Sequence, residues 1–171
     1  PHANFTDAPP DKLALYPDGS LPRRPNVNLD NASNSGHIAQ KNGSPQYEGY
    51  HAHITAIDGE LNRVLEAAAA SSRETIVIYT SDHGSMFGSH GMGSKRQPFE
   101  ESIRVPFMAW CPQRIAAGKS SNALIGAIDM MPTLCGLAGV SQPDTCMGQD
   151  FSGHILNGSG PEPDAQLIMH I

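Results

Sequence analysis

Residues 82–104 hold the densest group of side chains that could do chemistry. Asp82 and His83 stand side by side, Gly84 follows, and His90 and Lys95 come further along the same stretch. A carboxylate beside an imidazole offers two ligands for a divalent cation. Two ligands are too few on their own, because zinc takes four and calcium takes six to eight. The pair therefore predicts only part of a metal site.

A long helix and a short strand are expected to position this stretch. Apolar residues at spacings of three and four predict a helix from about residue 46 to residue 70: Ile54, Ile57, Leu61, Val64, Leu65 and Ala68. Residues 75–80 form an unbroken apolar run typical of a strand covered on both faces. Asp82 and His83 follow that strand, where open α/β sheets bind their ligands. Neighbouring side chains on a strand point to opposite faces, and Gly84 permits a curl that would let both reach one ion.

Further elements complete the expected fold. Residues 105–110 predict a second buried strand, and residues 129–137 predict a helix with Asp129 as its cap, Pro132 in its first turn and Gly139 after its end. Helices that alternate with buried strands indicate an α/β fold with a mostly parallel sheet flanked by helices and long loops. Glu101 and Arg104, three residues apart, are expected to form a structural ion pair.

Length and composition predict one domain and exclude two kinds of partner. The 171 residues form a single fragment, with a loop-rich segment (1–45), an α/β core (46–139) and a loop-rich tail (140–171). The net charge of −6 excludes a nucleic-acid backbone as the partner, and no apolar run is long enough to span a membrane. The three cysteines are expected to be free buried thiols, with a Cys135–Cys146 disulfide as the alternative.

Several motifs resemble the sulfatase family, which belongs to the alkaline phosphatase superfamily of metal-dependent ester hydrolases. That family carries a strand ending in T-S-D-[HN]-G, then L-G-x-H-G, a Lys, and Y/F-E-E-S-x-R-V-P. This sequence carries YTSDHG at 79–84, FGSHG at 87–91, Lys95, and FEESIRVP at 99–106. The likeness extends to DMMPTL at 129–134, to the helix over 50–65 and to PHANF at 1–5. The resemblance implies a partial alkaline-phosphatase-like fold.

The resemblance also implies roles for five residues. Asp82 and His83 would be metal ligands, Lys95 would contact a sulfate oxygen, and His90 would help to bind the substrate. His2 would lie near the bridging ester oxygen, as a contact or as a proton donor to the leaving alkoxide. These roles suit sulfuryl transfer, because a divalent ion and a fixed ammonium stabilise the charge on the equatorial oxygens, and a positioned acid speeds departure of a poor leaving group.

Two parts of a sulfatase site are not recognisable in the sequence. The family's nucleophile is a formylglycine made from Cys or Ser within [CS]-x-P-x-R, and an Asp pair completes the metal shell. Residues 20–24 (SLPRR) match that pattern but lie after the 1–5 segment, so we interpret them as a chance match. Residues 111–114 (CPQR) have Pro and Arg one position too early. The chain is thus interpreted as the carboxyl-terminal portion of an arylsulfatase-like sulfuric ester hydrolase, inactive alone and weak in metal binding, with the formylglycine in a missing amino-terminal half.

Expected partners and alternatives follow from the same resemblance. The metal would be Ca²⁺, with Mg²⁺, Mn²⁺ or Zn²⁺ as alternatives, and the substrate a sulfate ester of a small molecule or glycan. A portion of this kind would expose strand edges and apolar faces and is expected to self-associate. Two other functions stay open: a phosphonate monoester or phosphodiester hydrolase of the same superfamily, and a non-catalytic module that binds anionic ligands. The sequence assigns no compartment, although family members are often exported or lysosomal.

Overall fold

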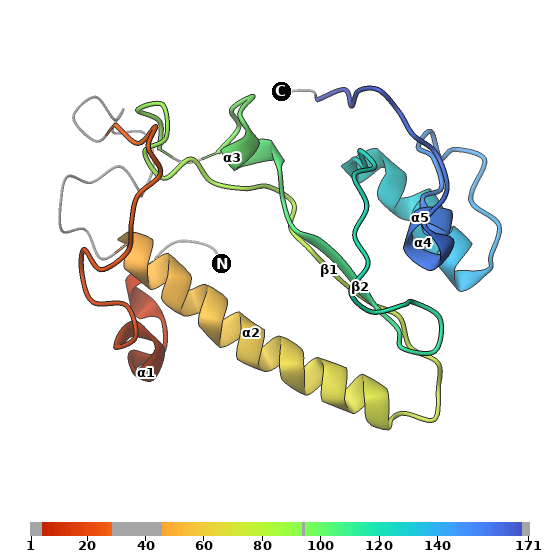
Figure 1. Cartoon of the computed structure of the whole chain (residues 1–171), viewed down its shortest axis with the longest axis horizontal. Helices are drawn as coiled ribbons and strands as arrows, with labels where there is room; N and C mark the ends of the chain where they lie inside the picture. The colour runs from red at the N-terminus through yellow and green to blue at the C-terminus, as the bar shows by residue number, and fades with distance from the viewer. Residues whose placement is uncertain (1–4, 29–45, 94, 169–171) are drawn as a thin grey trace. The chain divides into compact units, whose positions relative to one another are not determined.

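The computed structural model describes residues 5–28, 46–93 and 95–168, and Figure 1 shows its helices and strands. The chain divides into two compact units. Unit 1 is built from residues 1–72 and 83–105, and unit 2 from residues 73–82 and 106–171. The segment with His83, His90 and Lys95 therefore belongs to unit 1, and each unit is described by itself.

The long helix α2 (Gln46–Ala70) dominates unit 1 and confirms the helix predicted over residues 46–70. Its first half is packed, with Glu48, Gly49 and Ala52 buried, whereas Val64 is 52% exposed. The short helices η1 (Phe5–Asp7) and α1 (Pro10–Leu13) contact it. Both lie in the segment that was expected to be loop-rich. The sequence did not predict them, because helices of three and four residues leave no periodic signal.

Unit 2 contains the two strands of the described chain, β1 (Val77–Thr80) and β2 (Phe107–Trp110). They pair antiparallel, with Val77 opposite Trp110 and Thr80 opposite Phe107. This pair is therefore an antiparallel exception to the mostly parallel sheet that was expected. A parallel connection needs a crossover along the sheet, usually a helix, whereas among the described residues between these strands the helix is α3 (Glu100–Ile103), with four residues.

The strands are also less covered than expected. Every residue of β1 and β2 is half-buried or exposed, and Met108 is 52% exposed. Both strands begin two residues later than predicted, at Val77 rather than 75 and at Phe107 rather than 105. The unbroken apolar runs had predicted strands that are buried on both faces. The residues that the structure describes do not bury them in this way.

Helix α4 (Met130–Ala138) confirms the predicted helix over 129–137, shifted by one residue. Gly139 ends it in the left-handed conformation, at φ 68°, as expected of a glycine after a helix. Asp129 stands at its start but makes no capping bond. Its buried carboxylate instead accepts hydrogen bonds from the N–H groups of Gly126 and Gln149, both at 2.8 Å, and from the side-chain amide of Gln166 at 3.0 Å.

The tail contains one helix that the sequence did not predict, α5 (Ser152–Asn157). Just before it, the backbone N–H of Phe151 donates to the hydroxyl of Thr133 on α4, at 3.0 Å, and both residues are buried. All three cysteines are free thiols, as expected, and Cys111 and Cys135 are buried, whereas Cys146 is only half-buried. In the described parts of the chain, no helix is long and apolar enough to cross a bilayer.

Candidate functional site

Gly84 brings the loop after β1 against the backbone around α3. Its N–H donates to the carbonyl oxygen of Ser102 at 2.8 Å, and a Cβ at this position would overlap the carbonyl oxygen of Glu101. Gly84 is not among the residues with positive φ. The sequence thus indicated the right residue for the wrong reason: a glycine is required because two backbone segments touch, and not because the chain curls through a left-handed turn.

The next turn is held by an aromatic anchor. Phe87 has a φ of 47°, which costs a bulky side chain about 1–2 kcal/mol, and yet it is only 6% exposed. Its ring packs against those of Tyr50, Tyr47 and Phe5, with centroids at 4.6, 5.3 and 6.1 Å. Burial among these rings offsets the backbone strain and ties the loop to the start of α2 and to η1. No local sequence pattern predicts this role, because the rings come from three separate segments.

His83 and Lys95 are brought together within unit 1. The Nζ atom of Lys95 lies 2.7 Å from Nε2 of His83, and Nδ1 of His83 lies 2.8 Å from the carbonyl oxygen of Gly84. Both side chains are half-buried. The structure therefore unites two of the residues singled out from the sequence, a ring nitrogen and an ammonium.

His90 is occupied by a different set of partners. Its ring stacks on Phe99, with centroids 4.1 Å apart and an interplanar angle of 16°. The side-chain amide of Asn26 lies 3.1 Å from Nε2 of His90 and donates to Glu101 Oε1 at 2.7 Å. His90 and Glu101 are themselves 4.0 Å apart. These contacts hold loop 84–93 to residues 24–28. The role of His90 in substrate binding stays a prediction.

Glu101 is the carboxylate at the centre of that set. The hydrogen bond from Asn26 is the main reason that the pKa of Glu101 lies below its ordinary value, and the Arg24 guanidinium 3.9 Å away adds to the effect. Arg104 pairs with the exposed Glu100 at 3.3 Å. The expected Glu101–Arg104 pair is thus wrong, because the first turn of α3 points Glu101 toward Asn26. Asn26 did not stand out in the sequence, and Arg24 stood out only as part of the S-x-P-x-R match at 20–24.

The two other predicted site residues are less informative. Asp82 is exposed at the end of the segment that contains β1, with Oδ1 3.5 Å from the Ser81 hydroxyl. His2 lies outside the described residues. Among those that are described, no three His, Cys, Asp or Glu side chains gather as a metal-binding group. The donors themselves suit a divalent ion, since one is a carboxylate and the other an imidazole whose Nε2 is an acceptor.

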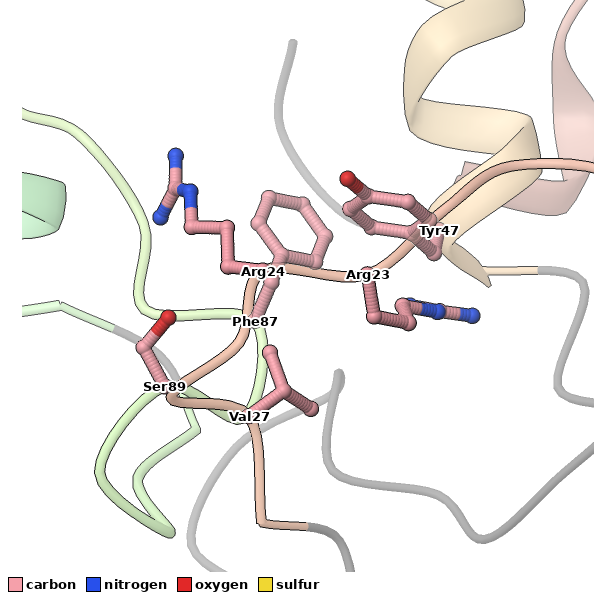
Figure 2. Close-up of a pocket in the computed structure, with 6 residues that line it drawn as sticks. All are labelled: Arg23, Arg24, Val27, Tyr47, Phe87 and Ser89. Atoms are coloured by element: carbon pink, nitrogen blue, oxygen red, sulfur yellow. The ribbon is translucent and has the colours of Figure 1, made fainter.

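Arg23 and Arg24, from the literal S-x-P-x-R match, line a small pocket that is partly open to solvent (Figure 2). The Arg23 guanidinium lies 3.8 Å from the centre of the Tyr47 ring and 3.5 Å from the buried carboxylate of Glu48. Figure 2 shows that the two guanidinium groups point in opposite directions, so they do not converge on one anion. These structural contacts support the interpretation of residues 20–24 as a chance match.

Comparisons with known proteins agree on one family. The sulfatase family model matches residues 1–140. The Ulvan-active sulfatase of Formosa agariphila is 34% identical over 172 residues, covering 91% of this chain and 32% of that protein. A crystal structure from Bacteroides fragilis, described as the sulfatase yidJ, superposes with a TM-score of 0.78 at 28% identity, covering 94% of this chain and 35% of that one.

This chain belongs to the sulfatase family, and its fold is the α/β fold of that family in part. It spans about a third of the length of the relatives it matches. A phosphonate monoester hydrolase from Silicibacter pomeroyi shares the fold, with a TM-score of 0.63 at 21% identity over 75% of this chain and 26% of that one. The family and the fold class predicted from the motifs at 79–106 are confirmed.

Proposed function

We propose that the full-length protein containing this chain hydrolyses sulfate esters of small molecules or glycans. Sulfate ester hydrolysis is the activity named for the family's members that this chain matches. The observation that carries the proposal is the 2.7 Å approach of Lys95 to His83 in the segment that carries the family's motifs. An ammonium beside a ligand for a divalent ion is the arrangement needed to neutralise the oxygens of a transferring sulfuryl group.

In this proposal Asp82 and His83 hold the divalent ion, together with ligands from the rest of the protein. Such an ion polarises a sulfate oxygen. Lys95 contacts another sulfate oxygen, His2 protonates the leaving alkoxide, and His90 helps to position the substrate. The chain alone then supplies part of a site, and we expect it to bind metal weakly and to turn over no sulfate ester.

The metal is proposed as Ca²⁺, Mg²⁺, Mn²⁺ or Zn²⁺, and the imidazole bears on this choice. Ca²⁺ and Mg²⁺ take oxygen ligands, whereas an imidazole nitrogen suits Zn²⁺ and other transition metals. His83 therefore favours Zn²⁺ over the Ca²⁺ expected from the resemblance. Adding each ion to the metal-stripped protein and measuring which one restores hydrolysis at the lowest concentration decides between them.

A second candidate is hydrolysis of phosphonate monoesters or phosphodiesters. The shared fold of the Silicibacter pomeroyi phosphonate monoester hydrolase supports it. The chemistry would use the same ion and the same ammonium, because a phosphoryl group presents similar charged oxygens. Comparing kcat/KM for aryl sulfate, aryl phosphonate monoester and aryl phosphodiester distinguishes the two candidates.

The test uses the full-length protein, made with its formylglycine, and two lysine variants. Lys95→Ala is expected to lower kcat/KM for the aryl sulfate by about 10²–10³-fold, as removal of one donor to a charged transition state does. Lys119→Ala, in an exposed loop of unit 2, is the matched control and is expected to leave the rate unchanged. A higher kcat/KM on a phosphonate ester or phosphodiester would favour the second candidate, and hydrolysis of none of the three would overturn both.

A further inference from the structure

The contacts of His83 define its tautomer. A carbonyl oxygen only accepts hydrogen bonds, so the 2.8 Å contact with Gly84 requires that Nδ1 of His83 carries the proton. In the neutral ring Nε2 then carries the lone pair, and it accepts from the Lys95 ammonium at 2.7 Å. Metal-binding histidines are oriented in the same way, with the second ring nitrogen donating to a carbonyl or carboxylate. The backbone at Gly84 thus prepares Nε2 to bind a cation.

One lone pair serves one cation. A metal ion on Nε2 would need the same lone pair, in the direction that the ammonium now occupies. The two positive charges would then be nearly in contact, in a partly buried site where their repulsion is stronger than in bulk water. A divalent ion and the Lys95 ammonium therefore exclude each other at this nitrogen.

We propose that Lys95 and a divalent metal ion are alternative cations on Nε2 of His83, so that binding of the ion moves the Lys95 ammonium off this nitrogen and frees it for an anionic oxygen. The inference rests on the proposed function for the presence of a metal. Lys95 can make this move because its ammonium ends a flexible four-carbon stem. Metal binding at His83 and the movement of the Lys95 ammonium toward a sulfate oxygen are then coupled.

The coupling has two measurable consequences. Lys95 competes with the ion, so its removal raises metal affinity. Conversely, metal binding releases the amine, so its reaction with an acylating reagent increases. A lysine that served only to attract anions would show neither effect, because it would not share a ligand with the metal.

The first experiment is a Zn²⁺ titration of the full-length protein, monitored by the ¹⁵N chemical shift of His83 Nε2 in wild type, Lys95→Met and Lys119→Met. Lys95→Met is expected to bind Zn²⁺ about 3–10-fold more tightly at His83, and Lys119→Met to match wild type. Equal or weaker binding by Lys95→Met overturns the inference and leaves the proposed metal site intact. No Zn²⁺-dependent shift of His83 in any variant overturns both.

The second experiment needs no substitution at Lys95. Brief acetylation of the wild-type full-length protein, followed by mass spectrometry, is expected to label Lys95 at least about threefold faster when Zn²⁺ saturates His83. Labelling of Lys12 and Lys119 is expected to stay constant. Unchanged or slower labelling of Lys95 at saturation overturns the inference, even where Lys95→Met fails to fold.

Discussion

Asn26 is the side chain on which the polar contacts of loop 84–93 converge. Its amide reaches His90 at 3.1 Å and Glu101 at 2.7 Å, across 64 and 75 residues of sequence. An amide with two N–H groups can serve both acceptors at once. The loop that contains Asn26, residues 24–28, is thereby held next to the segment that carries His83 and Lys95.

This bridge predicts how stability depends on pH. Because the hydrogen bond from Asn26 lowers the pKa of Glu101, the ionised carboxylate is favoured in the folded chain. Its contribution is full above the pKa of the unfolded carboxyl and is lost as the pH falls through the lowered pKa of the folded state. Glu101→Gln is expected to flatten the acid limb of the urea-unfolding midpoint plotted against pH.

Glu100→Gln is the matched control for that profile, since Glu100 is 69% exposed whereas Glu101 is 11% exposed. It is expected to leave the acid limb close to that of wild type. At pH 7, Asn26→Ala should cost about 1 kcal/mol, the size of one hydrogen bond. An equal flattening by both glutamine variants would contradict the assignment to Glu101.

For individual residues, the sequence predicted only part of the site. Lys95 and His83 could be assigned to one site in advance because both fall within the family's motifs. Asn26 could not, because its partners are defined by how two distant loops pack. Nothing in the local sequence around residue 26 carries that information.

Between elements, the backbone contact at Gly84 is the most demanding feature of the site. Gly84→Ala would force the loop and the carbonyl of Glu101 apart. We expect it to lower the free energy of unfolding by about 1–3 kcal/mol, in the range of strain and overpacking effects, as measured by urea denaturation.

Gly59→Ala is the control for Gly84→Ala, because it makes the same glycine-to-alanine change at a site without a close contact. Gly59 is exposed on α2, and nothing lies within 4 Å of its would-be Cβ. Alanine is expected to stabilise the helix there by about 0.5–1 kcal/mol, because glycine is the poorer helix former. If Gly84→Ala proved as harmless as Gly59→Ala, the close contact would not exist in solution.

Helices proved easier to predict than strand pairing. The periodicity of α2 and the flanking signals of α4 depend on neighbours in sequence, and both helices appear at the expected positions. The direction of the β1–β2 pair depends on the path of the chain between them, which no periodicity encodes. Helix α5, with six residues, was too short to register.

For the molecule as a whole, unit 2 exposes a row of apolar side chains. Ile128, in the short helix η2 (Ala127–Asp129), is 55% exposed, and Met131 and Leu134 on α4 are 54% and 42% exposed. These three residues recur every three positions, while Pro132, Thr133 and Cys135 on α4 are buried. Large apolar surfaces that stay in contact with water mark sites of association. In the relatives, which are about three times as long, further chain is available to cover such a face.

We therefore propose that this chain self-associates. Light scattering across a range of concentrations is expected to give a mass that rises above the 18.2 kDa of the monomer. The double variant Met131→Lys, Leu134→Lys is expected to shift the mass back toward the monomer. Gln142→Lys, an exposed polar control, should not shift it. A strict monomer at all concentrations would contradict the proposal.

The discontinuous make-up of unit 1 has a consequence for synthesis on the ribosome. Helix α2 can form as soon as it emerges, because its hydrogen bonds are local. The bonds from Asn26 to His90 and Glu101 must wait until about 75 more residues have been added, and the long chain closures they require fold slowly. Residues 73–82, which belong to unit 2, emerge during that interval. Loop 84–93, which carries His90, is thus among the last parts of unit 1 to gain its native contacts.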